Sequence, residues 1–221
     1  MSRTIEQILS MFPHTTAADW AQHASGGGWA QNTATVSATA YVGPDARVYG
    51  NACVYGNARV YDSARVYDSA RVYGNACVGG NACVYGNACV SGNACVSGNA
   101  YISGNACVYG NACVSGNACV SGNARISGNA RIHGGTWSLP PLYIVGSRWV
   151  AQATSKTTFA IGCEEHTLAE WRAGQGNIEE QYKLSPSERV EYRAYLDLWE
   201  KLYGPGGVYA EAETPSAEAK E

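Results

Sequence analysis

Small and aliphatic residues alternate with polar ones in a strict period of six along nearly half of the chain. From Ala34 to Ala130 an alanine stands at every sixth position, seventeen times in succession, and Val or Ile follows two residues later, from Val36 to Ile132. Residues two apart on an extended strand point to the same side, so each unit predicts a short strand with these two side chains facing inward. Such a strand cannot bury its inner face alone, and the period therefore predicts a solenoid of stacked coils.

The strands are separated by Gly-Asn, Asp-Ser or Gly-Gly pairs, which tolerate the left-handed backbone of a sharp turn. The whole pattern resembles the hexapeptide-repeat left-handed parallel β-helix family. In that family three hexads form one triangular coil, so the resemblance implies that residue i stacks on residue i+18. Extending the register backward to Gly28 and Ala30 places about eighteen hexads, or about six coils, in residues 28–134. The glycine placement, V-x-G-N-A-x, is more similar to uniform arrays in phage and prophage proteins than to the V-G-x-x-A-x of the family's acyltransferases.

Residues 1–27 lie outside the repeat and predict an N-terminal helical cap. The segment TIEQILSMF predicts a short amphipathic helix that ends at Pro13, and residues 16–22 predict a further helical turn before three glycines. A cap of this kind covers the unpaired strand edges at the open end of a solenoid.

Residues 135–204 predict a small α+β domain. Three short strands, LYIVGS, RWVAQAT and TFAIGC, are expected to form a meander. Two capping boxes then begin two helices: Thr167 with Glu170, in a helix expected to end at Gly174 and Gly176, and Ser185 with Glu188, in a helix expected to reach about residue 203. Residues 205–221 predict a disordered acidic tail. The predicted fold class is therefore mainly β, a left-handed parallel β-helix between a helical cap and an α+β domain.

The net charge of −3 is distributed unevenly along the chain. Residues 33–133 contain six Arg, three Asp and no Lys or Glu, which gives +3, whereas residues 134–221 contain eight basic and thirteen acidic residues, which gives −5. The chain has neither a secretion signal at its start nor an apolar segment long enough to cross a membrane, so we expect a soluble, cytoplasmic protein. In that compartment the nine cysteines are expected to be thiols, and eight of them occupy the outward position of the repeat.

The N-terminal half of the repeat places arginine and tyrosine at outward positions. One interpretation is a cationic, aromatic surface that binds nucleotides, nucleic acid or a protein. The alternative is a solvated face in which tyrosines stack on one another and Asp62 and Asp68 supply local counter-charges. The candidate binding residues are Arg47, Tyr49, Arg59, Arg65, Tyr67 and Arg71.

A second outward surface has small side chains. With a spacing of eighteen, Cys77, Cys95 and Cys113 stack beside Gly79, Ser97 and Ser115. Small, mostly uncharged side chains suit close packing against another copy of the chain, so we expect these cysteines at a homo-oligomer interface. A row spaced by about 4.8 Å is not a tetrahedral cage, and therefore we expect no metal site. Vertical disulfides fit this spacing, but the expected compartment argues against them.

Residues outside the repeat carry more varied chemistry. Cys163 and His166 form a C-x-x-H sequence at a strand end, where a helix N-terminus would lower the pKa of the thiol, although a buried strand cysteine is the simpler interpretation. Trp149 is a further candidate binding residue, and Trp171 and Trp199 are candidate interface anchors because tryptophan often contributes most to interfaces.

No residue is predicted to be catalytic, and no cofactor is predicted. The resemblance implies a histidine general base in acyltransferases of this fold and three zinc-binding histidines in its carbonic anhydrase class. Here only His133 lies near the repeat, and no loop interrupts the hexads. Because fold alone does not carry function, we expect a non-enzymatic binding or assembly protein.

Its partners are expected to be further copies of the chain, in a dimer or trimer, and a host protein or signalling nucleotide engaged by a phage accessory protein or inhibitor. The alternative is a hexapeptide-class acyl- or nucleotide-sugar-transferase with His133 as base. A flat-face binder of ice or polysaccharide is disfavoured, because Cys, Ser and Arg stand where such binders place Thr ladders.

Overall fold

The computed structural model describes residues 3–204 and residue 207, and the predicted tail at 205–221 otherwise lies outside the described residues. The chain divides into two compact units, Met1–Pro140 and Pro141–Glu221, which are considered separately. Among the described residues, no helix is both long and apolar enough to cross a membrane.

The first unit begins with a cap. Helix α1 (Ile5–Met11) starts at a capping box formed by Thr4 and Gln7, and Ile8 of this helix is buried with two tryptophans of the hairpin β1–β2. The prediction of a helical turn over 16–22 is wrong for most of that segment. Only the 3-10 turn η1 (Ala17–Asp19) is helical, and β1 (Trp20–Gln22) follows it and pairs antiparallel with β2 (Trp29–Gln31). Pairing across the hairpin outweighs the weak local helix preference.

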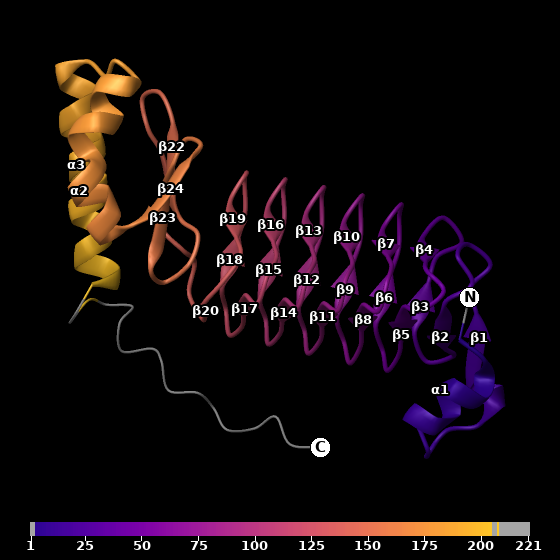
Figure 1. The fold of residues 1–221 in the computed structure, drawn as a ribbon. Helices are drawn as coiled ribbons and strands as arrows, with labels where there is room; N and C mark the ends of the chain where they lie inside the picture. Colours follow the sequence, from indigo (N-terminus) through magenta and orange to yellow (C-terminus); the bar gives the residue numbers. More distant parts are fainter. Residues whose placement is uncertain (1–2, 205–206, 208–221) are drawn as a thin grey trace. The chain divides into compact units, whose positions relative to one another are not determined.

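A parallel β-solenoid of three sheets follows the cap, and its coils stack one behind another in Figure 1. Face A is the sheet that β1 and β2 begin, and it continues with β5 (Arg47–Val48), β8 (Arg65–Val66), β11 (Cys83–Val84), β14 (Tyr101–Ile102), β17 (Cys119–Val120) and β20 (Thr136–Trp137). Face B contains β3 (Thr35–Val36), β6 (Cys53–Val54), β9 (Arg71–Val72), β12 (Cys89–Val90), β15 (Cys107–Val108) and β18 (Arg125–Ile126). Face C contains β4 (Tyr41–Val42), β7 (Arg59–Val60), β10 (Cys77–Val78), β13 (Cys95–Val96), β16 (Cys113–Val114) and β19 (Arg131–Ile132).

The predicted spacing of eighteen residues between stacked strands is confirmed. Cys77 pairs with Cys95 and Cys95 with Cys113, each in register and in parallel. Alanine and the aliphatic residue of each hexad point inward, and from Ala40 to Ile126 every one of these side chains is fully buried. Backbone N–H groups donate to the next coil, as from Cys95 to the Ala112 carbonyl at 2.9 Å, so each coil satisfies the edge of its neighbour.

Residues with a left-handed backbone conformation (positive φ) form the turns between strands. Most are glycines, such as Gly92 with φ +67°, and Asp62 and Asp68 occupy the same turn position with φ 53° and 57°. Each aspartate accepts a hydrogen bond at 3.1 Å from the backbone N–H of the equivalent glycine one coil further on, Gly80 or Gly86. These two carboxylates therefore complete turns of the solenoid, a role that the sequence interpretation as counter-charges did not identify.

The solenoid extends one strand beyond the repeat pattern. Thr136 pairs with Cys119 and Trp137 with Val120, so these stacked residues are separated by one residue fewer than the usual eighteen. The missing residue shortens the turn between β19 and β20. Trp137 therefore takes the inward aliphatic position, where it is 1% exposed. Its indole N–H donates to the Gly134 carbonyl at 2.8 Å. This tryptophan ends the column of buried side chains.

The second unit is a four-stranded antiparallel sheet packed against two helices (Figure 1). Its strands are β21 (Tyr143–Val145), β22 (Val150–Ala153), β23 (Thr158–Ile161) and β24 (Glu164–Thr167). The meander thus has one strand more than the sequence predicted. Both predicted capping boxes are present, at Thr167 before α2 (Leu168–Gln181) and at Ser185 before α3 (Pro186–Tyr203).

Helix α2 does not end at its glycines, and that prediction is wrong. The helix continues through Gly174 and Gly176 to Gln181. Each glycine costs a helix interior about 1 kcal/mol relative to alanine. Burial of Trp171 in the first half of the helix and of Glu179 in the second shows that tertiary packing holds both halves.

The glycine turns generate a first prediction. A Cβ added at Gly92 would lie 3.0 Å from the Gly110 carbonyl oxygen, in a left-handed conformation. Gly92→Ala should therefore lower the free energy of unfolding by more than about 1 kcal/mol. Gly92→Asp should cost less, because its carboxylate can accept the Gly110 N–H as Asp62 accepts that of Gly80. Denaturant unfolding measures both variants, and an alanine variant as stable as the aspartate variant would contradict the account of these turns.

Candidate functional site

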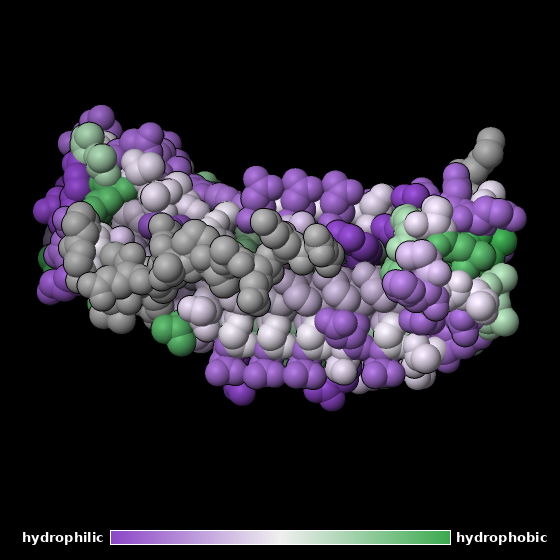
Figure 2. Space-filling model, turned by 90° about the horizontal axis from the view of Figure 1, so that it is seen from below, coloured by the Kyte–Doolittle hydropathy of each residue, from purple (hydrophilic) through white to green (hydrophobic). Residues whose placement is uncertain are grey.

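The predicted arginine and tyrosine surface is divided among the three faces of the solenoid. Face A holds Arg47, Tyr49, Arg65 and Tyr67, whereas Arg59 lies on face C and Arg71 on face B. Figure 2 shows side chains of similar hydropathy lined up in rows along the solenoid. The six candidate residues therefore do not form one binding surface.

Two of the six residues hold the N-terminal cap in place. Arg47 is only 9% exposed, and its guanidinium contacts the sulfur of Met11 in α1. Burial, together with neighbouring Arg3 and Arg65, lowers the pKa of Arg47. Tyr49 is edge-on to Phe12 of the cap, with ring centroids 4.9 Å apart. Neither side chain contributes to an open cationic surface, which was one of the two interpretations of these residues.

Tyrosines of face A form a continuous stack. The rings of Tyr49, Tyr67 and Tyr85 are parallel within 2°, with centroids 4.8 and 5.0 Å apart. Burial raises the pKa of Tyr67 above its usual range, and the neighbouring Tyr49 adds to this shift. Beside this stack, Arg65 donates to the sulfur of Cys83 at 3.1 Å. Each of these contacts thus joins a side chain of one coil to the equivalent side chain of the next coil.

Asparagine ladders, which were not predicted from the sequence, form a similar arrangement at the turns. In each ladder the amide nitrogen of one asparagine donates to the amide oxygen of the asparagine eighteen residues later. The longest ladder runs from Asn57 to Asn129, with distances between 3.0 and 3.4 Å. Strict repetition of Asn at the spacing of eighteen is the signal that could have revealed it.

The outward cysteines form two rows with arginine at both ends. On face C the order is Arg59, Cys77, Cys95, Cys113 and Arg131. Gly79 and Ser97 lie beside this row, and the ring of Tyr61 lies across Gly79. On face B the order is Arg71, Cys89, Cys107 and Arg125. All of these cysteines are free thiols.

The second unit contains a small apolar pocket that brings together two candidate binding residues. Trp149 and Cys163 line this cavity of about 30 Å³, together with Trp171, Tyr182 and Tyr192. The Arg148 guanidinium lies over the Trp149 ring, 4.4 Å from its centroid. The cavity has room for one or two water molecules, so it suits a small group or a side chain rather than a whole ligand.

A polar chain connects Cys163 to His166, the two members of the C-x-x-H sequence. Tyr182 links them, because its hydroxyl lies 3.6 Å from the Cys163 sulfur and also donates to Glu164. The other carboxylate oxygen of Glu164 lies 3.2 Å from Nε2 of His166. The Tyr182 hydrogen bond lowers the pKa of Glu164, and the same hydrogen bond raises the pKa of Tyr182. Tyr182 and Glu164 are site residues that spacing along the sequence could not indicate.

A larger groove in the second unit lies between the first turn of α2 and the last turn of α3. Its volume is about 360 Å³, within the range of ligand sites. Leu168 and Ala169 contribute the first turn of α2, and Trp199 and Tyr203 contribute aromatic rings. Lys156 lies over the Tyr203 ring, 5.7 Å from its centroid. The groove thus combines an aromatic wall with a lysine, the carboxylate of Glu200 and the first turn of α2, where the Glu170 carboxylate accepts the Thr167 backbone N–H at 2.8 Å.

Trp171 and Trp199 are buried inside the second unit, so the prediction that they anchor an interface is wrong. Each is 3% exposed. The indole N–H of Trp171 donates to the Phe159 carbonyl at 2.7 Å, and the ring of Trp199 stacks on that of Phe159. The indole N–H of Trp199 is buried and has no hydrogen-bond partner among the described residues. These large aromatic side chains fill the core of the second unit.

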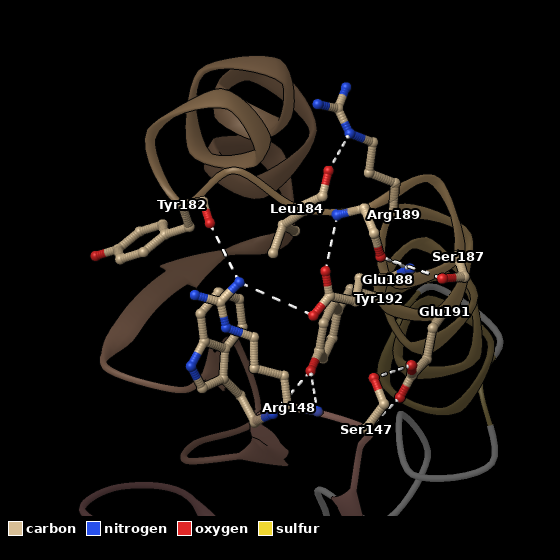
Figure 3. Close-up of polar contacts among 11 residues, drawn as sticks. Ser147, Arg148, Tyr182, Leu184, Ser187, Glu188, Arg189, Glu191 and Tyr192 are labelled. Carbon is tan, nitrogen blue, oxygen red and sulfur yellow. Dashed lines mark hydrogen bonds and ion pairs between the residues drawn. The ribbon is translucent and has the colours of Figure 1, made fainter.

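Helix α3 holds the turn before β22 through the contacts drawn in Figure 3. Glu191 accepts hydrogen bonds from Ser147, and the Tyr192 hydroxyl accepts the backbone N–H of Trp149 at 2.8 Å. The Arg148 guanidinium donates to the Tyr182 carbonyl at 3.2 Å and lies 3.9 Å from a Glu188 oxygen. These contacts fix the position of Trp149 at the pocket.

Metal-binding and transferase chemistry depend on how histidines and acidic groups are placed. Within residues 3–204 and 207, no group of three or more His, Cys, Asp or Glu side chains is arranged to hold a metal ion. His133 lies on the exposed side of face C, directly after β19.

The family model of the YdcK beta solenoid repeat matches three segments of the chain, residues 46–62, 52–68 and 124–139. All three segments lie in the solenoid, and the last includes Trp137. The chain is therefore similar to a repeat β-solenoid family in this part of its length. No curated protein and no solved structure matches the chain.

The polar chain in the second unit generates a second prediction. Because the folded-state pKa of Glu164 is lowered, its ionised form contributes stability above the unfolded-state pKa, and this contribution is lost as the pH falls. Tyr182→Phe removes the main cause, so it should raise the pKa of Glu164 and make stability less sensitive to acid. NMR titration of the carboxyl carbon measures the pKa. The control Tyr195→Phe, which removes a hydrogen bond to Glu191, should leave Glu164 unchanged, and an unchanged Glu164 in Tyr182→Phe would refute the assignment.

Proposed function

We propose that the chain is a non-enzymatic binding and assembly protein, in which the solenoid is a rigid scaffold and the second unit recognises a partner. The groove at the N-terminus of α2 carries this proposal. It combines a volume of about 360 Å³ with Lys156, two aromatic rings and the first turn of a helix. The ring of Trp199 lines the groove, and its buried indole N–H finds no acceptor within the part of the chain that the structure describes. This supports the proposal further, since buried donors in proteins normally have an acceptor.

The chemistry of the groove favours a ligand group with negative charge. The Leu168 and Ala169 N–H groups belong to the first turn of α2, where helix geometry provides no acceptor within the helix. The carboxylate of Glu200, which also lines the groove, is paired with Arg172 at 2.9 Å. A nucleotide phosphate or an acidic side chain of a host protein suits this arrangement, and its apolar part would lie against Trp199 and Tyr203.

The contacts between outward side chains of successive coils support a scaffold role for the solenoid. Asparagines bond to asparagines and tyrosines stack on tyrosines in successive coils. Repeating units present repeating surfaces, which suit extended packing more than recognition of one small ligand. We therefore assign partner recognition to the second unit and assembly to the solenoid.

The finer parts of the proposal rest on the resemblance of the hexapeptide repeat. It implies a left-handed solenoid and, from the similarity to uniform arrays, a phage or prophage accessory protein, whereas the homo-oligomer is inferred from the small outward side chains of face C. Such a protein would act in the cytoplasm of the host cell, as an inhibitor of a host factor or by binding a signalling nucleotide. The strip around Cys77, Cys95 and Cys113 is the proposed surface for self-association.

The groove can be tested with a pair of lysine variants. The full chain is purified from its host, and native mass spectrometry measures the mass of retained ligands or partners. We expect Lys156→Gln to reduce retention at least about tenfold, because loss of a charge-assisted contact costs about 1.5–3 kcal/mol. Lys201→Gln makes the same change of charge on the exposed side of α3 and should have no effect. Equal retention by both variants would reject the groove.

Self-association can be tested with a pair of arginine variants, since arginine is native to this position of the repeat. Sedimentation equilibrium of the full chain at tens of micromolar should show a dimer or trimer. Cys95→Arg, in the middle of the face C strip, should dissociate it, whereas Cys107→Arg on face B should not. A monomeric parent protein would refute the assembly role, and an oligomer that survives Cys95→Arg would exclude the face C strip.

A further inference from the structure

Five of the eight solenoid cysteines have another cysteine directly above or below them. Cys77, Cys95 and Cys113 form the row on face C, and Cys89 and Cys107 form the row on face B. The other three solenoid cysteines lack such a neighbour. Cys53 pairs with Thr35 and Arg71, Cys83 pairs with Arg65 and Tyr101, and Cys119 pairs with Tyr101 and Thr136.

The cysteines within a row repeat with the strands. The Cys77 sulfur lies 3.8 Å from the Asn75 carbonyl, and the Cys113 sulfur lies 3.9 Å from the equivalent Asn111 carbonyl. On face B the Cys107 sulfur lies 3.7 Å from the Asn105 carbonyl, whereas the Cys89 sulfur lies 3.4 Å from the Tyr73 hydroxyl. The strands of each row pair in register, so successive cysteines follow the strand spacing of about 4.8 Å, and rotation of their side chains can bring neighbouring sulfurs to a shared cation. A metal–thiolate bond is about 2.3 Å long, so a cation held linearly between two sulfurs needs them about 4.6 Å apart. The spacing that excludes a tetrahedral cage thus fits a two-coordinate site.

The charges at the ends of both rows fit the same chemistry. Two thiolates and a monovalent cation carry a net charge of −1, and each row is bounded by two exposed arginines, Arg59 and Arg131 on face C and Arg71 and Arg125 on face B. Burial raises the pKa of the Cys95 and Cys107 thiols, and at Cys107 the neighbouring Arg125 and Arg71 act against this rise. The guanidinium groups thus favour the thiolate form at the ends of the rows. Among the solenoid cysteines, only these two rows have an arginine on both sides: Cys53 and Cys83 each have one neighbouring arginine, and Cys119 has none.

We propose that the two cysteine rows bind soft monovalent cations such as copper(I), each held linearly between the thiolates of successive coils. Soft thiolate ligands select copper(I). Two thiols release two protons to solvent as two metal–sulfur bonds form, and neither the metal nor the sulfur changes oxidation state. A linear site needs only two ligands, so it does not require the three-ligand group that is absent from the described residues. This proposal is independent of the groove in the second unit.

The test is an anaerobic titration of the full, reduced chain with copper(I) against a chromogenic copper(I) chelator, with native mass spectrometry to count the cations bound per chain. Every protein carries Cys163→Ser, because that thiol is exposed in the second unit. We expect one tightly held cation for each row. Cys95→Ser should remove the face C cation, since Cys77 and Cys113 are then about 9.6 Å apart. Cys89→Ser should remove the face B cation, and the double variant should lose both.

Cys53→Ser is the matched control, because it removes an outward thiol that has no cysteine neighbour, and it should bind as the parent does. X-ray absorption should show two sulfur neighbours around the copper. Zinc(II), which prefers four ligands, should not bind in stoichiometric amounts. The proposal is overturned if Cys53→Ser weakens binding as much as Cys95→Ser, if the double variant keeps its copper, or if the copper has three or more sulfur neighbours. Cys89 and Cys107 lie outside the face C strip that is proposed for self-association. Copper binding by this pair therefore tests the metal proposal independently of the oligomeric state.

Discussion

The hydrogen bonds between successive coils are the constraint on which the solenoid depends. Each strand is only two or three residues long, so its backbone groups are satisfied by the coils above and below it and not by a long sheet partner. These bonds require successive strands to stay in register, and the spacing of eighteen residues maintains that register in every coil but the last, which is one residue shorter. Because the backbone repeats so regularly, each outward side chain lies one strand spacing from the side chain at the equivalent position of the next coil. Where the sequence repeats, the two neighbours are residues of the same type. The Asn ladders, the tyrosine stack and the cysteine rows all follow from this one condition.

The solenoid could be predicted from the sequence because its determinants are local and repeated. Alternation of Ala34 and Val36 fixes the inward side, and the spacing of six fixes the turns. The cap and the second unit were harder, because their structure depends on contacts between distant residues. Residues 20–22 form a strand only because 29–31 pair with them. Gly174 and Gly176 remain within α2 because burial of Trp171 and Glu179 outweighs their low helix propensity.

Candidate site residues were predicted less well than the fold, again because their contacts are with residues far away in the sequence. Sequence reasoning identified Arg47 as an outward residue, which is correct for the strand, but could not foresee that α1 covers it. Cys163 and His166 were chosen for their spacing, whereas the groups that connect them are Glu164 and Tyr182, and the latter comes from the far end of α2. The tryptophans were predicted at an interface because their type is common there. In a unit of this size the same residues are needed for the core.

The shortened last turn and Trp137 have a consequence for how the length of such a protein can change. Any whole coil in the middle of the solenoid has equivalent neighbours on both sides, so its removal or duplication joins two compatible surfaces and leaves both ends intact. The ends differ from the middle: one is covered by the cap at Arg47, and the other is closed by an indole in place of an aliphatic side chain. Coil number can therefore vary by recombination between near-identical repeats without new terminal structures, and the length of the rod becomes a property that selection can adjust in steps of eighteen residues.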